Sequence, residues 1–149
     1  MNRRSMLGHT GAVVALMATA GLIPQIAFAQ ANAFDAKSLA EVIKALGGGA
    51  PTISADIILT AADIAENGAV VPLGVSTTLP GVRKLLLLVE KNPSALAASF
   101  NVNDAVDASI NTSVKMGQSS NVYGVAMMND GRVLYAQKEV KVTLGGCGG

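Results

Sequence analysis

The sequence lacks tryptophan, has one histidine and one cysteine, and only 14% of its 149 residues are charged. The histidine, His9, lies with Arg3 and Arg4 in an N-terminal stretch that we expect to be removed. Of the 11 Lys and Arg residues, 9 then remain against 10 acidic residues, a net charge of −1. Without histidine, a His-based triad, a histidine general base and a His/Cys metal site are excluded. Without clustered Lys and Arg, a nucleic-acid surface is excluded as well.

Hydrophobic residues make up 50% of the chain, which argues against disorder. About 120 residues remain after the N-terminal stretch, enough for one domain with a buried core. We therefore expect a single compact domain.

The first 29 residues have the pattern of an export signal. Arg3 and Arg4 precede an apolar run from Gly11 to Ala29 that ends in small-x-small form. This pattern predicts a signal peptide over residues 1–29, with cleavage between Ala29 and Gln30. The arginine pair is typical of a twin-arginine (Tat) signal and predicts a periplasmic protein.

The alternative to a cleaved signal is a transmembrane anchor. The apolar run is almost long enough to span a bilayer. Pro24 and Gln25 interrupt it, however, and small residues follow. We therefore expect no membrane anchor.

Residues 30–49 are expected to form an N-terminal helical segment. Its helix is predicted over Gln30–Leu46, with Asp35 as the N-terminal cap. One apolar stripe has helical spacing: Leu39, Val42, Ile43 and Leu46. Three consecutive glycines and a proline then end the helix.

Residues 50–144 alternate between apolar and polar side chains, as strands do. Strands are predicted over Asp56–Leu59, Ala69–Thr78, Leu85–Val89, Leu96–Val102, Ile110–Met116, Val122–Met128, Arg132–Gln137 and Val140–Leu144. Leu85–Val89 is continuously apolar, which indicates a strand covered on both faces. Pro72 indicates an edge or a bulge. Short strands without intervening helices predict an all-β, immunoglobulin-like antiparallel sandwich.

The last five residues consist of a cysteine between glycine pairs, Gly145-Gly146-Cys147-Gly148-Gly149. Glycine loses the most backbone entropy on ordering, so we expect a flexible arm when this segment is free. Such an arm is thin enough to enter a narrow channel in another protein. A thiol delivered to a foreign active site needs this geometry.

Other uses of this cysteine are less consistent with the sequence. A disulfide within the chain needs a second cysteine, which is absent. A prenylation box places its cysteine four residues from the end, between aliphatic residues. An intermolecular disulfide through Cys147 stays open, and with it an exported structural sandwich as the alternative function. A further alternative is a carrier that holds sulfur as a thiocarboxylate on a terminal Gly-Gly. Such a carrier needs neither an export signal nor a cysteine, so the leader and Cys147 both argue against it.

The tail motif, together with four internal stretches, resembles the SoxY family, the sulfur-carrier subunits of the bacterial Sox system of thiosulfate oxidation. The stretches are Ile64–Pro72, Val89–Pro93, Ser119–Val122 and Lys138–Thr143. The resemblance covers essentially the whole chain and includes the twin-arginine leader.

The resemblance implies a carrier that is not an enzyme and has no cofactor. Cys147 would hold sulfur intermediates covalently, as an S-thiosulfonate and a persulfide. The implied partners are a SoxZ-like subunit in a heterodimer and, transiently, a haem-containing thiosulfate-loading enzyme, a sulfate-releasing hydrolase and a sulfane dehydrogenase. The family fold is an immunoglobulin-like sandwich.

Further expectations concern the interface and side chains outside the tail. We expect Leu85–Val89 to help bury the heterodimer interface. We expect Asp104 and Asp107 to lie in a solvated loop, and Tyr123 and Tyr135 to pack across strands. Of Met127 and Met128, at least one should be ordinary core because neighbours on a strand face opposite sides.

Overall fold

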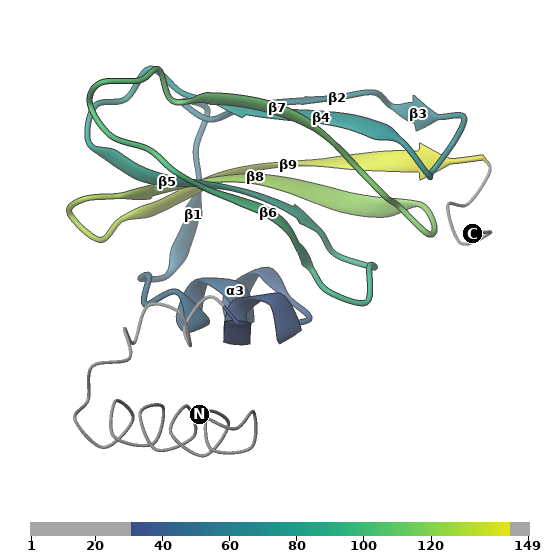
Figure 1. The fold of residues 1–149 in the computed structure, drawn as a ribbon, viewed down its shortest axis with the longest axis horizontal. Coiled ribbons are helices and arrows are strands. Elements are labelled where there is room, and N and C mark those ends of the chain that lie inside the picture. The colour runs from purple at the N-terminus through teal and green to yellow at the C-terminus, as the bar shows by residue number, and fades with distance from the viewer. Residues whose placement is uncertain (1–30, 144–149) are drawn as a thin grey trace, which may run out of the picture.

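The computed structural model describes residues 31–143. Two β-sheets lie face to face, and a short helix covers the outer face of the larger sheet (Figure 1). The larger sheet has the order β1-β9-β8-β5-β6, with β3 also paired to β9, and the smaller sheet has the order β2-β4-β7. The all-β sandwich expected from the sequence is confirmed.

The strands have the following bounds. The larger sheet consists of β1 (Pro51–Ile53), β3 (Ile64–Ala65), β5 (Val82–Val89), β6 (Leu96–Asn101), β8 (Ser120–Met128) and β9 (Val133–Val142). The smaller sheet consists of β2 (Ile58–Ala61), β4 (Val71–Ser76) and β7 (Ser109–Val114). Pairings are antiparallel except for β1 and β3, which run parallel to β9.

The prediction of two strands over Arg132–Gln137 and Val140–Leu144 was wrong, because β9 is continuous. Its polar residues Gln137 and Glu139 pair with Tyr123 and Asn121 of β8 without a break. The polar residues therefore mark exposed positions rather than a turn. β8 and β9 form an antiparallel hairpin, and Gly131 adopts φ 91 in the turn between them.

Two hydrophobic clusters lie on opposite faces of the larger sheet. The cluster between the sheets includes Leu85, Leu87 and Val89, and the cluster beneath the helix includes Leu86 and Leu88. All five side chains have 0% exposure. The expectation that β5 is covered on both faces is confirmed. The expectation that Leu85–Val89 forms a heterodimer interface is wrong, because the chain itself buries every one of these residues.

The helix α3 (Leu39–Ala45) is shorter than expected, and its cap is not Asp35. Ser38 occupies the N-cap position, and its side chain accepts a hydrogen bond from the Glu41 backbone N–H. Residues 31–35 form a separate helical turn. The expected stripe faces the sheet, with Val42 and Ile43 buried. Gly47, at φ 74, ends the helix in a conformation that favours glycine.

Pro72 lies in the central strand of the smaller sheet, yet it is locally at an edge. It pairs with Ser113 of β7 on one side. On the other side β2 ends with Ala61, which pairs with Leu73. Proline has no N–H to donate, and here no neighbouring strand needs one.

Candidate functional site

The candidate site begins where β9 ends, because the glycine-flanked cysteine follows that strand in the sequence. Cys147 and the glycines Gly145, Gly146, Gly148 and Gly149 lie outside the described residues. So do Arg3, Arg4 and the cleavage position between Ala29 and Gln30. The described part of the site is Lys141–Thr143, which we call the arm root.

On one side, β3 and its flanking residues hold the arm root. The Lys141 backbone N–H donates to the Asp63 carbonyl (2.9 Å), and the Thr143 N–H donates to the Ala65 carbonyl (3.1 Å). The Thr143 hydroxyl also donates to the Glu66 carbonyl (3.1 Å). These bonds fix the path of the chain as far as the last described residue.

On the other side, the segment that leads into β8 holds the arm root. The Val142 N–H donates to the Ser119 hydroxyl oxygen at 2.9 Å. Val140, two residues earlier, is fully buried between the sheets. Hydrogen bonds therefore hold the arm root on both sides, and the buried Val140 side chain anchors the preceding part of β9 in the core.

One ion pair reinforces the β3 side of the root. The Lys138 ammonium contacts the Asp63 carboxylate at 2.9 Å and donates to the Ala61 carbonyl at 2.6 Å. Because the Asp63 side chain is 87% exposed, the pair contributes at most about 1 kcal/mol. Its effect is to position the short strand β3 beside β9.

Replacing Ser119 by alanine removes the acceptor of the Val142 N–H. We expect a loss of roughly 1 kcal/mol in the free energy of unfolding and faster hydrogen exchange at the Val142 amide. Ser113→Ala, at an exposed position of β7, is the matched control and should change neither quantity. Unchanged exchange at Val142 in the Ser119→Ala variant would contradict this role.

Titratable side chains near this end of the sheet include Glu90 and Tyr123. The Tyr123 hydroxyl donates to the Glu90 carboxylate (3.3 Å), which also accepts from the Asn121 side chain (3.1 Å). Burial first, and then the negative charge of Glu90, raise the pKa of Tyr123 above its ordinary value. The phenol therefore stays protonated as a donor. Tyr123 also packs against Tyr135, as expected, with ring centroids 6.0 Å apart.

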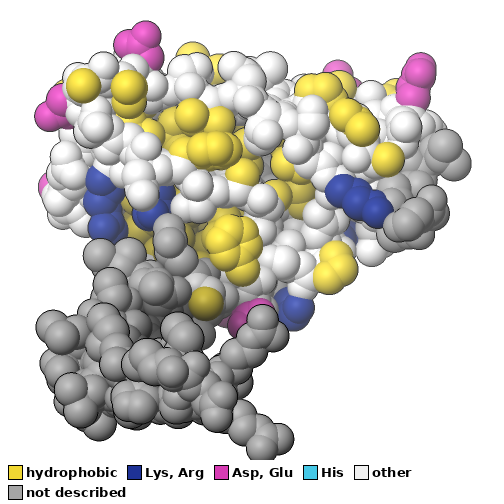
Figure 2. Space-filling model, in the orientation of Figure 1, with side chains coloured by type: hydrophobic (Ala, Val, Ile, Leu, Met, Phe, Trp, Pro, Cys, Tyr) yellow, Lys and Arg dark blue, Asp and Glu magenta, His cyan; other side chains and the backbone are white. Residues whose placement is uncertain are grey.

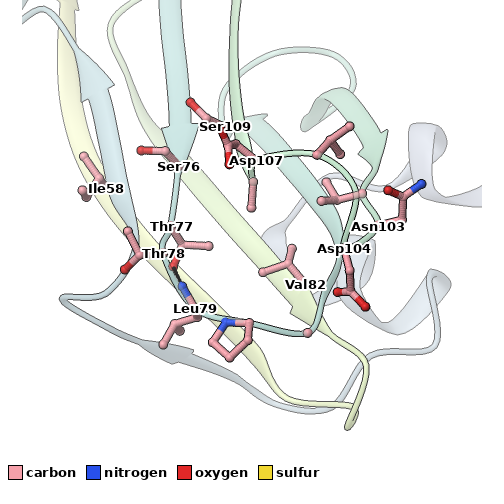
Figure 3. Close-up of a pocket in the computed structure, with 15 residues that line it drawn as sticks. Ile58, Ser76, Thr77, Thr78, Leu79, Val82, Asn103, Asp104, Asp107 and Ser109 are labelled. Atoms are coloured by element: carbon pink, nitrogen blue, oxygen red, sulfur yellow. Dashed lines mark hydrogen bonds between the residues drawn. The ribbon is translucent and has the colours of Figure 1, made fainter.

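A cavity of about 660 Å³ lies at the opposite end of the sandwich. The loops after β4 and β6 line it, and Asp104 and Asp107 lie on its wall (Figure 3). Both carboxylates are exposed, in agreement with the expected solvated loop. Within residues 31–143 no group of three or more His, Cys, Asp or Glu side chains has an arrangement that would hold a metal ion.

This cavity and the arm root are far apart. The cavity includes Val82, which pairs with Met128 at one end of β8, whereas the arm root lies beside Ser120 at the other end. Eight residue steps of β8 correspond to roughly 26 Å. The cavity is therefore not part of the arm site.

Sequence reasoning did not identify the residues that hold the arm root. Ser119 and Asp63 act through contacts between segments that are distant in the sequence. Ser119 lies in one of the stretches that carry the family resemblance, but the stretch does not show that its hydroxyl holds the arm root. Met127 and Met128 are both core residues, one in each hydrophobic cluster. No helix of the described chain is long and apolar enough to cross a membrane.

Comparison with known families gives a match over most of the chain. A family model described as sulfur oxidation protein SoxY matches residues 43–147. The chain is also similar to the sulfur carrier protein SoxY from Chlorobium limicola f thiosulfatophilum. Identity is 31% over 69% of this chain and 93% of that chain, with a TM-score of 0.62.

More distant similarity concerns the fold alone. A superoxide reductase (neelaredoxin) from Ignicoccus hospitalis is 18% identical over 58% of this chain and 79% of its own, with a TM-score of 0.52. The comparison with curated proteins gave no match.

The family match runs from Ile43, within α3, through both sheets to Cys147, and the structural match covers 69% of the chain. The resemblance inferred from the tail and the internal stretches is thereby confirmed. The chain belongs to the SoxY family, whose members are sulfur carriers in sulfur oxidation and not enzymes.

Proposed function

We propose that Cys147 is the covalent attachment site for thiosulfate-derived sulfur, and that Gly145, Gly146, Gly148 and Gly149 form the arm that presents it. The observation that supports this most is the family match, which extends to Cys147, the single cysteine of the chain. A carrier of covalently bound sulfur needs a thiol, and no other side chain here offers one.

The proposed loading step joins the Cys147 sulfur to the outer sulfur of thiosulfate. The thiol loses its proton and two electrons pass to the haem-containing loading enzyme, which leaves an S-thiosulfonate on Cys147. A hydrolase then adds water across the sulfur–sulfonate bond and releases sulfate and protons. A persulfide remains on Cys147 as the substrate of a sulfane dehydrogenase.

The arm root defines how far the arm reaches. From Thr143 to Cys147 there are four residues, which span at most roughly 13–14 Å when extended. The backbone N–H and hydroxyl of Thr143 are bonded to the β3 side. Motion of the arm would thus pivot about a fixed point, and the sandwich would stay outside the enzyme whose channel the arm enters.

Glycines make the arm narrow and adaptable, at a cost in affinity. Ordering each residue in a partner's channel costs on the order of 1–2 kcal/mol. Contacts with each enzyme are therefore expected to be brief, which suits release after every step. The enzymes supply the redox and hydrolytic groups, and the carrier supplies the thiol.

The remaining parts of the proposal concern location and assembly. We infer export to the periplasm by the Tat pathway, with removal of residues 1–29. We also infer a lasting heterodimer with a SoxZ-like subunit, because a carrier whose enzyme contacts are brief needs a stable interface elsewhere. Residues 50–144 form the carrier domain in this proposal, and residues 30–49 the helical segment that precedes it.

Intact mass before and after reduction tests the attachment. After incubation with thiosulfate and the loading enzyme, the carrier should gain a reducible group on one chain, mapped to the peptide that contains Cys147. A product of twice the chain mass would instead support the alternative, an exported structural sandwich joined by an intermolecular disulfide.

The thiol itself is expected to be unactivated in the free carrier. No Lys, Arg or helix N-terminus lies near Cys147 in the sequence, so its pKa should be close to the reference value of about 8.5. Alkylation by iodoacetamide should therefore accelerate with pH up to a midpoint near that value. A midpoint well below 7 would show that the carrier activates its own thiol.

A further inference from the structure

The two sides of the sandwich protect their sheet edges very differently. On one side the strands β1, β2 and β3 have only 3, 4 and 2 residues. β1 begins with Pro51, and the Lys138 ammonium binds the Ala61 carbonyl of β2. Short strands, proline and lysine are the usual means of preventing a free edge from pairing with another chain.

The opposite side has fewer of these protections: its edge strands are longer and contain no proline, and one lysine contact is present, from the Lys84 ammonium to the Asn101 side chain at the end of β6 (2.6 Å). Its edges are β6, with the sequence LAASFN, and β7, with the sequence SINTSV, each of six residues without charge or proline. β7 lies in front of β4 in Figure 1, so Figure 2 looks onto this side and shows hydrophobic side chains across its middle. A long, apolar, uncharged edge is a site for strand pairing.

Of these two edges, β6 is the one suited to pairing. Four of its residues, from Ala97 to Phe100, are half-buried and uncharged, so apolar surface and an unpaired strand edge lie together there. In β7, exposed Ser109, Asn111 and Ser113 alternate with more buried residues. This alternation is typical of a strand with one face exposed to solvent. The Phe100 aromatic side chain adds apolar surface to β6.

The register shows which backbone groups of β6 are free to pair. The Val102 N–H donates to the Arg83 carbonyl, and the same register pairs Leu85 with Phe100 and Leu87 with Ala98. Antiparallel pairs alternate between bonded and non-bonded positions. The N–H and carbonyl groups of Ser99 and Asn101 therefore point away from β5, towards the open side.

Cavities lie at both ends of β6, and their charges are opposite. At the end of β6 the cavity of about 660 Å³ includes Asp104 and Asp107 and no Lys or Arg. At its beginning a cavity of about 390 Å³ includes Leu96, Ala97 and Lys115 and no Asp or Glu. A strand paired with β6 would thus contact an acidic cavity at one end and a basic cavity at the other.

We propose that the edge of β6 binds the lasting second subunit of the carrier, through an extended strand of that subunit. This inference rests on the heterodimer of the proposed function and says where its interface lies. The strand is uncharged in its middle, carries a basic side chain opposite Asp104 and Asp107, and carries an acidic side chain opposite Lys115. Main-chain bonds to Ser99 and Asn101 supply part of the affinity.

A subunit bound at the edge of β6 would leave the arm root accessible to the enzymes. β9, which leads into the arm, is separated from β6 by β8 and β5. Three inter-strand spacings amount to roughly 14 Å. A subunit paired along β6 would extend the sheet away from the arm root rather than cover it.

Amide hydrogen exchange with and without a purified SoxZ-like subunit tests the proposal on the unaltered chain. The Ser99 and Asn101 amides should exchange quickly in the free chain and at least about tenfold more slowly in the complex. Asn111 and Ser113 of β7 also direct their amides outward, because the Thr77 N–H donates to the Ala108 carbonyl in that register. They are the matched controls and should not change. Protection at β7 instead, or at neither strand, overturns the proposal.

A proline at each edge gives the corresponding binding test. Ser99→Pro removes the outward N–H, and the Ser99 hydroxyl has no hydrogen-bond partner within residues 31–143 to lose. We expect this variant to bind the SoxZ-like subunit at least about tenfold more weakly, and Ser113→Pro to bind as the wild type does. Equal binding by Ser99→Pro, or equal loss by Ser113→Pro, contradicts the proposal.

These outcomes are separate from those of the proposed function. Loading of Cys147 is read by mass on the wild-type chain and does not depend on which edge binds the subunit. If loading fails while β6 is protected, the attachment proposal is wrong and the interface stands. If the wild-type chain does not bind the subunit, the heterodimer and the β6 interface are both wrong.

Discussion

Replacing Cys147 by serine is expected to abolish sulfur loading completely and to stop thiosulfate oxidation that depends on this carrier. Serine keeps the size and polarity of the side chain but is not oxidised to a mixed sulfur–sulfur bond. Because Cys147 is the single cysteine, no second thiol is available as a substitute. Mass spectrometry of the isolated chain and the rate of thiosulfate consumption measure the two effects.

A displaced thiol is the sharpest control for this experiment. In the double variant Cys147→Ser with Ser113→Cys, one thiol remains, on an exposed position of β7. It should react with iodoacetamide but should not be loaded by the enzymes, because it cannot enter their channels. Normal loading at position 113 would show that the arm is unnecessary.

Replacing Leu87 by alanine should destabilise the chain strongly, with or without a partner. Leu87 has 0% exposure and lies between the two sheets, where the side chains on both faces are already packed. Removing a buried leucine side chain costs about 2–5 kcal/mol in the free energy of unfolding. For a domain of this size the midpoint of thermal unfolding should fall by roughly 10 °C or more.

The matched control is an apolar residue of similar size on the surface. Ile53, at the end of β1, is 64% exposed, and Ile53→Ala should change the unfolding free energy by less than about 0.5 kcal/mol. Thermal unfolding followed by circular dichroism compares the two variants. A Leu87→Ala variant that is destabilised only when the second subunit is present would restore β5 as an interface.

The sequence predicted those parts of the fold that depend on local periodicity. The continuous apolar run Leu85–Val89 indicated a strand buried on both faces, and all of its side chains are buried in the structure. The same run was misread as an interface, because a sequence does not say whether the chain itself or a partner covers a face. Here the helix α3, whose stripe includes Val42 and Ile43, supplies the second cover.

The arm root shows the limit of local patterns. β3 has two residues and exists only through its pairing with Lys141 and Val142. Its contribution, like that of the Ser119 hydroxyl, depends on contacts between segments far apart in the sequence. The cysteine between glycines, by contrast, is recognisable without any structure, because its composition is itself the signal.

The account depends most on a covalent sulfur adduct at Cys147, and one measurement tests it directly. The peptide that contains Cys147 is isolated under non-reducing conditions from cells that are oxidising thiosulfate, and its mass is determined before and after reduction. The account predicts an added thiosulfate-derived group or added sulfur on that peptide, removed by reductant. An unmodified thiol, or a peptide joined to a second chain, would contradict it.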